Sequence, residues 1–230
     1  MTYIRSSTTT IQGIPGSTGS RTEFAMLVTF HSKPEYREEL EKLLREDVLE
    51  ARKEEGNLYM QLYRAKDNPY TCFLFERWKD QGALDAHFEK PYTKAVLELC
   101  NKALTAPMAI MFLNDLTPIS PVHYQRLPKD AGKATDLVVV FSVKEGEQER
   151  FVRQFQDSAQ YSRSEPGCVA FHVHAVKDAS NTFVLYERWE SREALDAHFE
   201  QPYTEALFTL FEEVLEQPVE ECLNYITWVI

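Results

Sequence analysis

The sequence has few cysteines, no long apolar stretch and no excess of positive charge. Its four cysteines include no Cys-X-X-Cys pair, so neither a disulfide framework nor a zinc site is expected. It contains no run of about 18 apolar residues, which argues against a membrane span. The 25 Lys and Arg are outnumbered by 36 Asp and Glu, and the net charge of −11 argues against nucleic acid as a partner.

The N-terminal stretch also lacks the features of a targeting signal. No basic start is followed by an apolar core, so no secretory signal is predicted and the cytoplasm is the expected location. Residues 1–22 are instead rich in Ser, Thr and Gly, and we predict a disordered tail because so polar a segment cannot build a core. An arm that docks on a partner subunit is the alternative.

What the sequence does contain is one stretch of 19 residues that occurs twice. Residues 75–93 return as residues 186–204, and 13 of the 19 positions are identical. The identical segments are Glu-Arg-Trp, Ala-Leu-Asp-Ala-His-Phe-Glu and Pro-Tyr-Thr. Chance does not produce such agreement, so the chain is predicted to carry one domain duplicated at an offset of 111 residues.

The hydrophobic pattern predicts the element order β-α-β-β-α-β in each half. Short apolar or alternating runs predict the first-half strands, at 24–30, 58–64, 71–78 and 109–113. Helical spacing predicts one helix that Pro34 opens and Gly56 ends. A second helix is predicted to begin at the capping residue Asp80 and to restart at Pro91.

The second half repeats this order from residue 137 onward, with Ser191 in the capping position of Asp80. The expected domains are residues 23–116 and 134–230. They are joined by a polar, proline-containing linker at 117–133.

Each half is therefore expected to form a four-stranded antiparallel sheet with two helices on one face. The predicted hairpin strand is apolar on both faces, with Leu58, Met60 and Leu62 on one side and Tyr59 and Tyr63 on the other. The face without helices must then be covered. The expected fold is α+β, with two tandem ferredoxin-like domains packed sheet to sheet as an intramolecular pseudo-dimer. Pairing of each half with another chain is the alternative, and a further homodimer is left open.

The repeated motif, a strand ending in Glu-Arg-Trp followed by Ala-Leu-Asp-Ala-His-Phe and a Pro-Tyr-Thr restart, resembles the antibiotic biosynthesis monooxygenase family. The resemblance covers residues 23–116 and 134–230 and implies the dimeric α+β barrel fold. It also implies a small-molecule substrate in a cavity between the sheet and the second helix, and O2 as the co-substrate. The family includes cofactor-free oxygenases of quinols and anthrones, so no cofactor and no metal are expected.

The resemblance places His87 and His198 as candidate catalytic bases. Both lie on the inward helix face that carries Leu84 and Leu195, and imidazole titrates near neutral pH, as a general base must. The alternative is a structural histidine that fixes the helix to the neighbouring strand.

Further residues are predicted to contact the substrate, either because they flank the two histidines or because they add titratable groups nearby. Trp78 and Trp189 would wall an aromatic molecule or belong to the core. Glu76 and Glu187 would orient the imidazoles or form surface ion pairs. The predicted substrate-binding residues are Trp78, Trp189, Tyr92, Tyr203, His172, His174, Glu76 and Glu187.

The two halves differ at His172 and His174, which share one strand face and correspond to Gln61 and Tyr63. Two histidines alone do not make a metal site, and a pair lining a cavity or an interface is favoured. Since the second half carries the additional titratable groups, it is favoured as the active half.

We expect a cofactor-independent monooxygenase acting on an electron-rich phenolic, quinol or anthrone-type molecule. Haem degradation is not expected, because the axial His of that branch is replaced by Leu97 and Phe208. Two alternatives remain. One is an isomerase or other proton-transfer enzyme for a small carbonyl compound, with Lys90, Lys94 and Lys102 available to a phosphate. The other is a non-catalytic binding or stress-response protein.

Overall fold

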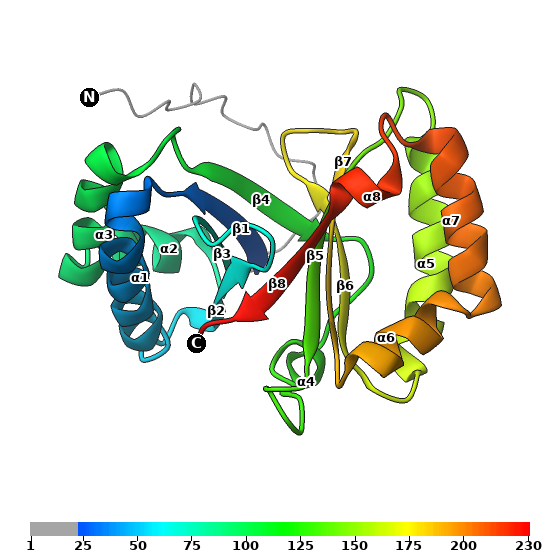
Figure 1. Ribbon diagram of the computed structural model, residues 1–230, viewed down its shortest axis with the longest axis horizontal. Helices are drawn as coiled ribbons and strands as arrows, with labels where there is room; N and C mark the ends of the chain where they lie inside the picture. Colours follow the sequence, from blue (N-terminus) through cyan, green and yellow to red (C-terminus); the bar gives the residue numbers. More distant parts are fainter. Residues whose placement is uncertain (1–22) are drawn as a thin grey trace, which may run out of the picture.

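Eight antiparallel strands close into one barrel in the computed structural model, which describes residues 23–230 (Figure 1). The predicted N-terminal tail lies outside the described residues. Helices cover the barrel on two opposite sides, one set from each half of the chain. No helix within residues 23–230 is both long and apolar enough to cross a membrane.

Both halves have the predicted order of elements, with a short helix between them. The first half contains β1 (Phe24–His31), the 3-10 turn η1 (Pro34–Tyr36), α1 (Arg37–Ala51), β2 (Asn57–Ala65), β3 (Thr71–Trp78), α2 (Gln81–Phe88), α3 (Pro91–Ala103) and β4 (Ala109–Asp115). The connection contains α4 (Pro121–Tyr124). The second half contains β5 (Thr135–Ser142), α5 (Gln148–Ser164), β6 (Cys168–Val176), β7 (Thr182–Trp189), α6 (Arg192–Phe199), α7 (Pro202–Val214), α8 (Val219–Cys222) and β8 (Leu223–Trp228).

The repeated sequence motif fixes the turn from the central hairpin into the second helix. The Asp80 side chain accepts a hydrogen bond from the Ala83 backbone N–H, and Ser191 does the same for Ala194. Gly56 was predicted to end the first helix, which ends earlier, at Ala51. Gly56 instead permits close contact, since a Cβ atom there would lie 2.2 Å from the Ala83 Cβ atom.

The barrel is built by pairing the two half-sheets edge to edge. The strand order is β1-β3-β2-β8-β5-β7-β6-β4, and the ring closes between β4 and β1. The halves meet where β8 pairs with β2, at Tyr63 and Trp228, and where β4 pairs with β6, at Asp115 and His174. Each half thus donates its last strand to the hairpin of the other, which leaves no strand of the barrel unpaired at an edge.

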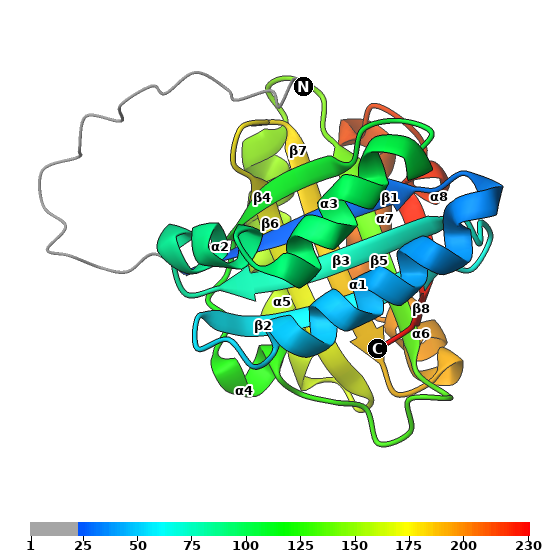
Figure 2. The same cartoon turned by 90° about the vertical axis from the view of Figure 1, so that its left-hand side faces the viewer.

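Three apolar clusters result, one beneath each set of helices and one inside the barrel. Figure 2 shows α1 and α3 lying across the outer face of the first-half strands. Met60 and Leu62 pack beneath these helices, while Tyr59 and Tyr63 point into the barrel, as predicted. Leu58 was expected on the Met60 side. It packs against the interior cluster instead, because the register shifts between Asn57 and Tyr59.

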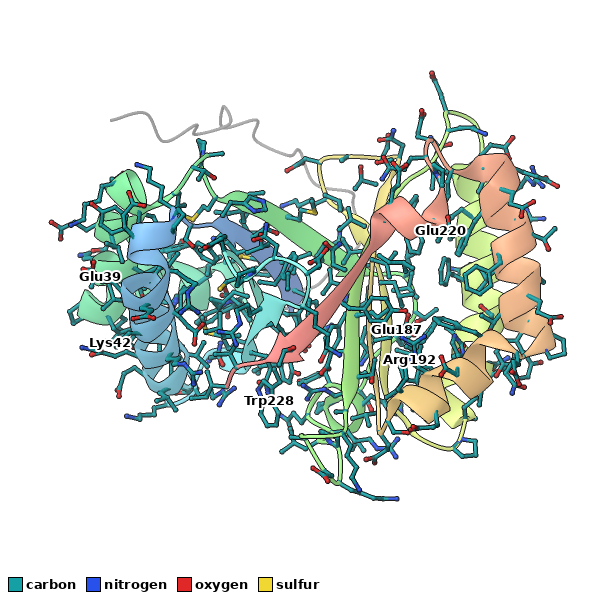
Figure 3. The ribbon with its side chains drawn as sticks, in the orientation of Figure 1. Glu39, Lys42, Glu187, Arg192, Glu220 and Trp228 are labelled. Carbon is teal, nitrogen blue, oxygen red and sulfur yellow. The ribbon has the colours of Figure 1, made fainter. Side chains whose placement is uncertain are left out.

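The connection between the halves closes one end of the barrel. Tyr124 of α4 is buried, with its ring 6.4 Å from the ring of Tyr59 and 4.9 Å from the guanidinium carbon of Arg77. Figure 3 shows side chains filling the layers on both sides of the sheets, with Glu39 and Lys42 on the outer side of α1. The segment predicted as a plain linker therefore contributes to the interior core.

Candidate functional site

A cavity lies between the first-half sheet and its helices, where the resemblance predicted one. Its volume is about 40 Å³. This is room for a few water molecules, since one water needs roughly 10–15 Å³. Most of its wall is apolar, and four polar side chains gather in it. The lining residues are Met26, Val28, Phe30, Leu44, Asp47, Leu74, Glu76, His87, Phe88, Thr93, Val96, Leu97, Met108 and Ile110.

His87 lies on α2 and its side chain is almost fully buried. Its Nδ1 atom is 2.8 Å from Glu54 Oε1, and the Tyr92 hydroxyl donates to the same oxygen at 2.9 Å. An ionised carboxylate only accepts hydrogen bonds, so Nδ1 carries the proton and donates it to Glu54. The Nε2 atom is then left to accept a proton.

The Nε2 side of His87 faces an acid and a hydroxyl. Nε2 is 3.7 Å from Asp47 Oδ2. The Thr93 hydroxyl donates to Asp47 at 2.8 Å, and its oxygen lies about equally far from both ring nitrogens, 3.3 Å from Nε2 and 3.4 Å from Nδ1. A proton gained by Nε2 would thus lie near the carboxyl group of Asp47. Burial raises the pKa of Asp47, while the nearby His87 and the Thr93 hydrogen bond oppose that rise.

Glu76 was predicted to orient the imidazole or to form a surface ion pair, and the structure places it in neither role. It is buried, and its Oε2 atom accepts a hydrogen bond of 2.7 Å from the Trp78 indole. Burial raises the pKa of Glu76 to about 8, although the Trp78 hydrogen bond lowers it. Glu76 is therefore a neutral acid at pH 7 that lines the cavity.

Trp78 and Tyr92 were predicted to contact the substrate. The Trp78 ring packs on the His87 ring at 4.7 Å between centroids, and Trp78 is not among the residues that line the cavity. Tyr92 is bound to Glu54, beyond the imidazole. Both side chains therefore hold His87 and its partner in place.

The second half repeats most of this arrangement. His198 Nδ1 is 2.6 Å from Glu165, Trp189 donates to Glu187 at 2.8 Å, and the Trp189 and His198 rings stack at 4.6 Å. Glu187 lies between the sheet and α6 (Figure 3), and burial raises its pKa. Tyr203 flanks the imidazole as Tyr92 does, with ring centroids 6.4 Å apart.

The second half differs at the position of Asp47. Ser158 stands there, and its hydroxyl donates to the Gln154 carbonyl at 2.9 Å instead of facing the imidazole. A proton gained by His198 Nε2 would therefore meet no carboxylate from this helix.

Phenylalanine rings fill the second-half layer where the first half has smaller residues. Leu44, which lines the first-half cavity, is replaced by Phe155, and Cys100 is replaced by Phe211. The rings of Phe155 and Phe211 are 5.9 Å apart, and both contact Phe141, at 5.7 and 5.1 Å. In the second half, packed rings thus stand at the positions of smaller first-half residues.

His172 and His174 lie inside the barrel, on the opposite sheet face from His198. His174 Nε2 is 3.2 Å from Asp115, and neither ring nitrogen of His172 has a hydrogen-bond partner among the described residues. Burial lowers the pKa of both histidines, so both are neutral at pH 7. No group of three or more His, Cys, Asp or Glu within residues 23–230 is placed to hold a metal ion.

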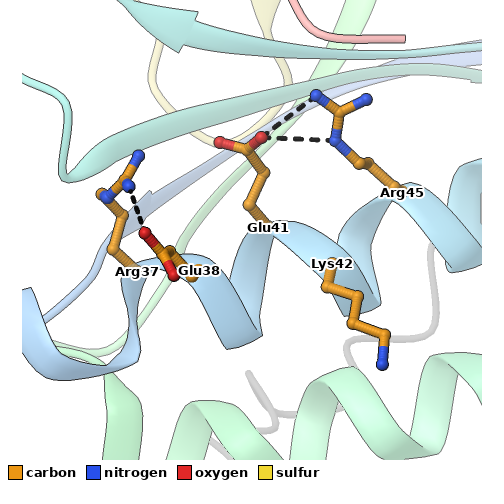
Figure 4. A pocket seen from close by; sticks show the side chains of 5 residues that line it. All are labelled: Arg37, Glu38, Glu41, Lys42 and Arg45. Carbon is orange, nitrogen blue, oxygen red and sulfur yellow. Dashed lines mark hydrogen bonds and ion pairs between the residues drawn. The ribbon is translucent and has the colours of Figure 1, made fainter.

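A second depression, of about 200 Å³, lies on the surface of α1 (Figure 4). Its lining is wholly charged, and its central acid Glu41 is already bound by Arg45 at 3.1 Å and by Arg64 at 2.8 Å. Ligand sites for small organic molecules are mostly apolar, so this depression is an ion-paired helix surface. Its lining residues are Arg37, Glu38, Glu41, Lys42 and Arg45.

The sequence interpretation missed three residues of the first-half site: Glu54, Asp47 and Thr93. Glu54 and Thr93 have identical counterparts 111 residues later, Glu165 and Thr204, so the repeat itself carried a signal for them. Asp47 has no such counterpart. Its place beside His87 depends on how α1 packs against α3, where Thr93 donates to it.

A family model described as "Antibiotic biosynthesis monooxygenase" matches residues 24–99 and 137–210. An uncharacterised protein of Synechocystis sp. is 34% identical over 97 residues, which are 41% of this chain and 66% of that protein. The chain thus spans less than two thirds of that relative. The "Putative monooxygenase YcnE" of Bacillus subtilis is 27% identical over 84 residues, 36% of this chain and 88% of that protein.

Solved structures share the whole architecture at low sequence identity. A Lactobacillus acidophilus protein named "putative monooxygenase" is 17% identical, with a TM-score of 0.72 over 90% of this chain and 94% of that chain. An "anthrone oxidase-like protein" is 16% identical, with a TM-score of 0.61 over 90% of this chain and 92% of that chain. At these identities the likeness establishes the fold.

Proposed function

Because the chain belongs to the antibiotic biosynthesis monooxygenase family, we propose that it is a monooxygenase that oxidises an electron-rich phenolic, quinol or anthrone-type molecule with O2 and without a cofactor. The observation that carries the proposal is the environment of His87. Its imidazole is held by Glu54 on one side, lies 3.7 Å from Asp47 on the other, and lines a mostly apolar cavity. The monooxygenase name of the Bacillus subtilis relative supports the reaction class.

His87 is the general base in this proposal. Glu54 accepts a hydrogen bond from the Nδ1–H group, which keeps that proton in place and leaves Nε2 free to take a proton from the substrate. The carboxylate of Asp47 and the oxygen of Thr93 then stabilise the imidazolium. The apolar wall keeps bulk water away from the substrate anion.

The substrate itself supplies the electrons. Its carbanion forms a bond to one oxygen atom of O2, and the resulting peroxide takes up the proton held by His87. Loss of water then breaks the O–O bond and the remaining C–H bond, which leaves a carbonyl group. One oxygen atom enters the product and the other leaves as water, so the reaction needs no external reductant.

A ring-sized substrate must displace side chains at the mouth of the cavity, because small-molecule pockets usually measure about 300–1,000 Å³. Phe88, Leu97 and Met108 border the cavity and are only half-buried. Met in particular adapts its shape easily. We assign the opening to these three residues.

We assign the reaction to the first half. The sequence alone favoured the second half for its additional histidines, but His172 and His174 face the barrel interior, away from His198. Two differences support the first half. Asp47 lies beside His87, whereas Ser158 turns away from His198, and Leu44 lines the cavity, whereas Phe155 packs against Phe211.

The test is oxygen consumption with a panel of hydroquinones and anthrones, using chelator-treated protein without added flavin or haem. We expect one O2 to be consumed per substrate molecule and one oxygen atom from labelled O2 in the product. Turnover of a carbonyl compound without oxygen uptake would instead indicate a proton-transfer enzyme. Saturable binding without any turnover would leave a non-catalytic binding protein.

A further inference from the structure

The ionisable groups around the first-half cavity are all acids, apart from the imidazole of the proposed base. Asp47 and Glu76 line it, and Glu54 lies directly behind His87. Within the described chain, no Lys or Arg is among the lining residues. His87 is already bound to a carboxylate, so it is not free to neutralise a ligand's negative charge.

The two lysines of the neighbouring helix α3 contact other side chains at the protein surface. Lys94 pairs with Glu89 at 2.7 Å, and the Lys102 ammonium lies 5.5 Å from the Tyr36 ring centroid. A carboxylate or phosphate entering the cavity would therefore lose its hydration without gaining a counterion. Burial of an unpaired charge is among the largest penalties in a protein.

The polar residues of the cavity lie at its buried end, and apolar residues lie at its exposed border. Its polar residues His87, Asp47 and Thr93 are each at most 4% exposed, whereas Ile110 at its border is 43% exposed. The apolar residues Phe88, Leu97 and Met108 are half-buried beside Ile110. A ligand would thus place its single hydroxyl or keto group at the buried end and its rings at the mouth.

We propose that the first-half cavity selects substrates that carry no charge, and that Asp47 is the residue that sets this preference. The inference rests on the proposed location of the site and names its substrate class: neutral, ring-containing molecules with one ionisable hydroxyl or activated C–H group. Carboxylated or phosphorylated analogues of the same size are rejected. Asp47 sets the preference because it is the acid that lines the cavity nearest the imidazole, and Ser158 takes its place in the filled half.

The experiment compares the binding of anthrone and of an anthrone carboxylic acid by calorimetry at pH 7.5 without oxygen. We expect the acid to bind at least about tenfold more weakly, since its carboxylate would be buried among acidic side chains with no cation to pair with. Asp47→Asn keeps the size and an acceptor for Thr93, and should reduce the ratio between the two compounds several-fold. Ser158→Ala, the matched change in the other half, should leave the ratio as it is.

A blocking variant locates the binding. Leu44→Phe places the second-half residue in the first-half cavity and should abolish binding of both compounds. Thermal unfolding of the variant verifies that it is folded. Unchanged binding by Leu44→Phe would overturn the placement in this cavity.

The remaining outcomes separate this inference from the proposed function. Equal or tighter binding of the acid by the wild-type protein would overturn the preference for neutral ligands. An unchanged ratio in Asp47→Asn would overturn the role of Asp47. Preferential binding of anthrone without oxygen uptake would leave the inference standing and refute the oxidation. Binding of neither compound at millimolar concentration would contradict both.

Discussion

Phe75 and Tyr186 occupy equivalent positions in the two halves and stack on each other inside the barrel, with ring centroids 4.8 Å apart and planes at 17°. This pair marks the approximate two-fold axis of the duplicated domain. The residues around it have diverged. The hydroxyl groups of Tyr63 and Tyr186 are hydrogen-bonded at 2.5 Å. The counterpart of Tyr63 in the second half is His174, which packs edge-on against Phe75 and lies 3.2 Å from Asp115. Fusion of the halves in one chain permits this divergence, because the two sides of the interface no longer share one sequence.

The Tyr63–Tyr186 hydroxyl pair is expected to stabilise the junction of the halves. Tyr63→Phe leaves the fully buried Tyr186 hydroxyl without a partner, which should reduce the free energy of unfolding by about 1–3 kcal/mol. Removing both hydroxyls in Tyr63→Phe/Tyr186→Phe should recover part of that loss. Urea unfolding of the wild type, of Tyr63→Phe, of Tyr186→Phe and of the double variant measures the coupling free energy between the two hydroxyls. The exposed Tyr161→Phe serves as the control. Simple additivity of the two single losses would contradict the pairing.

His172 should make the barrel sensitive to acid. Burial and the nearby His174 and Arg77 lower its pKa below the ordinary value of 6.5. Below pH 6.5 the unfolded chain then binds a proton at this position that the folded protein does not, so stability falls as the pH falls. His172→Gln, which copies Gln61, should remove up to about 1 kcal/mol of this loss per pH unit. Unfolding midpoints of the wild type and of His172→Gln at pH 7.5 and pH 5 measure this difference. An equal loss of stability in the two proteins would argue against a neutral, buried His172.

Glu76 should have the opposite effect, between about pH 5 and pH 8. Its pKa is raised from 4.5 to about 8, so between these values the folded protein holds a proton that the unfolded chain has released. Stability should therefore decrease from pH 5 to pH 8 and level off above. Glu76→Gln keeps an acceptor for Trp78 and should flatten the profile by roughly 1 kcal/mol per pH unit. An unaltered profile in this variant would show that Glu76 is ionised in the folded protein.

The phenylalanine cluster of the second half is expected to act in stability alone. Phe155→Ala should cost about 3–5 kcal/mol in the free energy of unfolding, because the buried ring contacts several others. Phe155→Leu, the residue of the first half, should cost less and leave oxygen uptake unchanged. A loss of uptake in a stably folded Phe155→Leu protein would place part of the reaction in the second half.

The fold could be predicted from the sequence because both the duplication and the two-sided apolar hairpin can be read directly from the order of residues. The register shift that turns Leu58 into the barrel could not, since it depends on how β2 pairs with β3. The carboxylate partner of His87 was missed for a similar reason. Glu54 is distant in sequence and reaches α2 only through the chain that follows α1, whereas Glu76 is closer in sequence but is bound by Trp78.

The sequence also could not predict that a cavity lies beneath the helices of the first half, whereas phenylalanine rings pack beneath those of the second. Leu44 and Phe155 are both ordinary core residues, and only packing distinguishes a cavity from a filled layer. The additional histidines of the second half were visible in the sequence, but the strand face on which they lie places them in the barrel interior.

The most direct test of the account is the rate of oxygen uptake by His87→Ala compared with His198→Ala, on whichever quinol or anthrone the wild-type protein oxidises. The two histidines have matching carboxylate and tryptophan partners, so the pair is a matched control within one chain. We predict that His87→Ala lowers kcat by about 10²–10⁴-fold, the usual contribution of a general base, and that His198→Ala retains wild-type turnover. Full activity in His87→Ala, or a loss confined to His198→Ala, would contradict the assignment of the reaction to the first half.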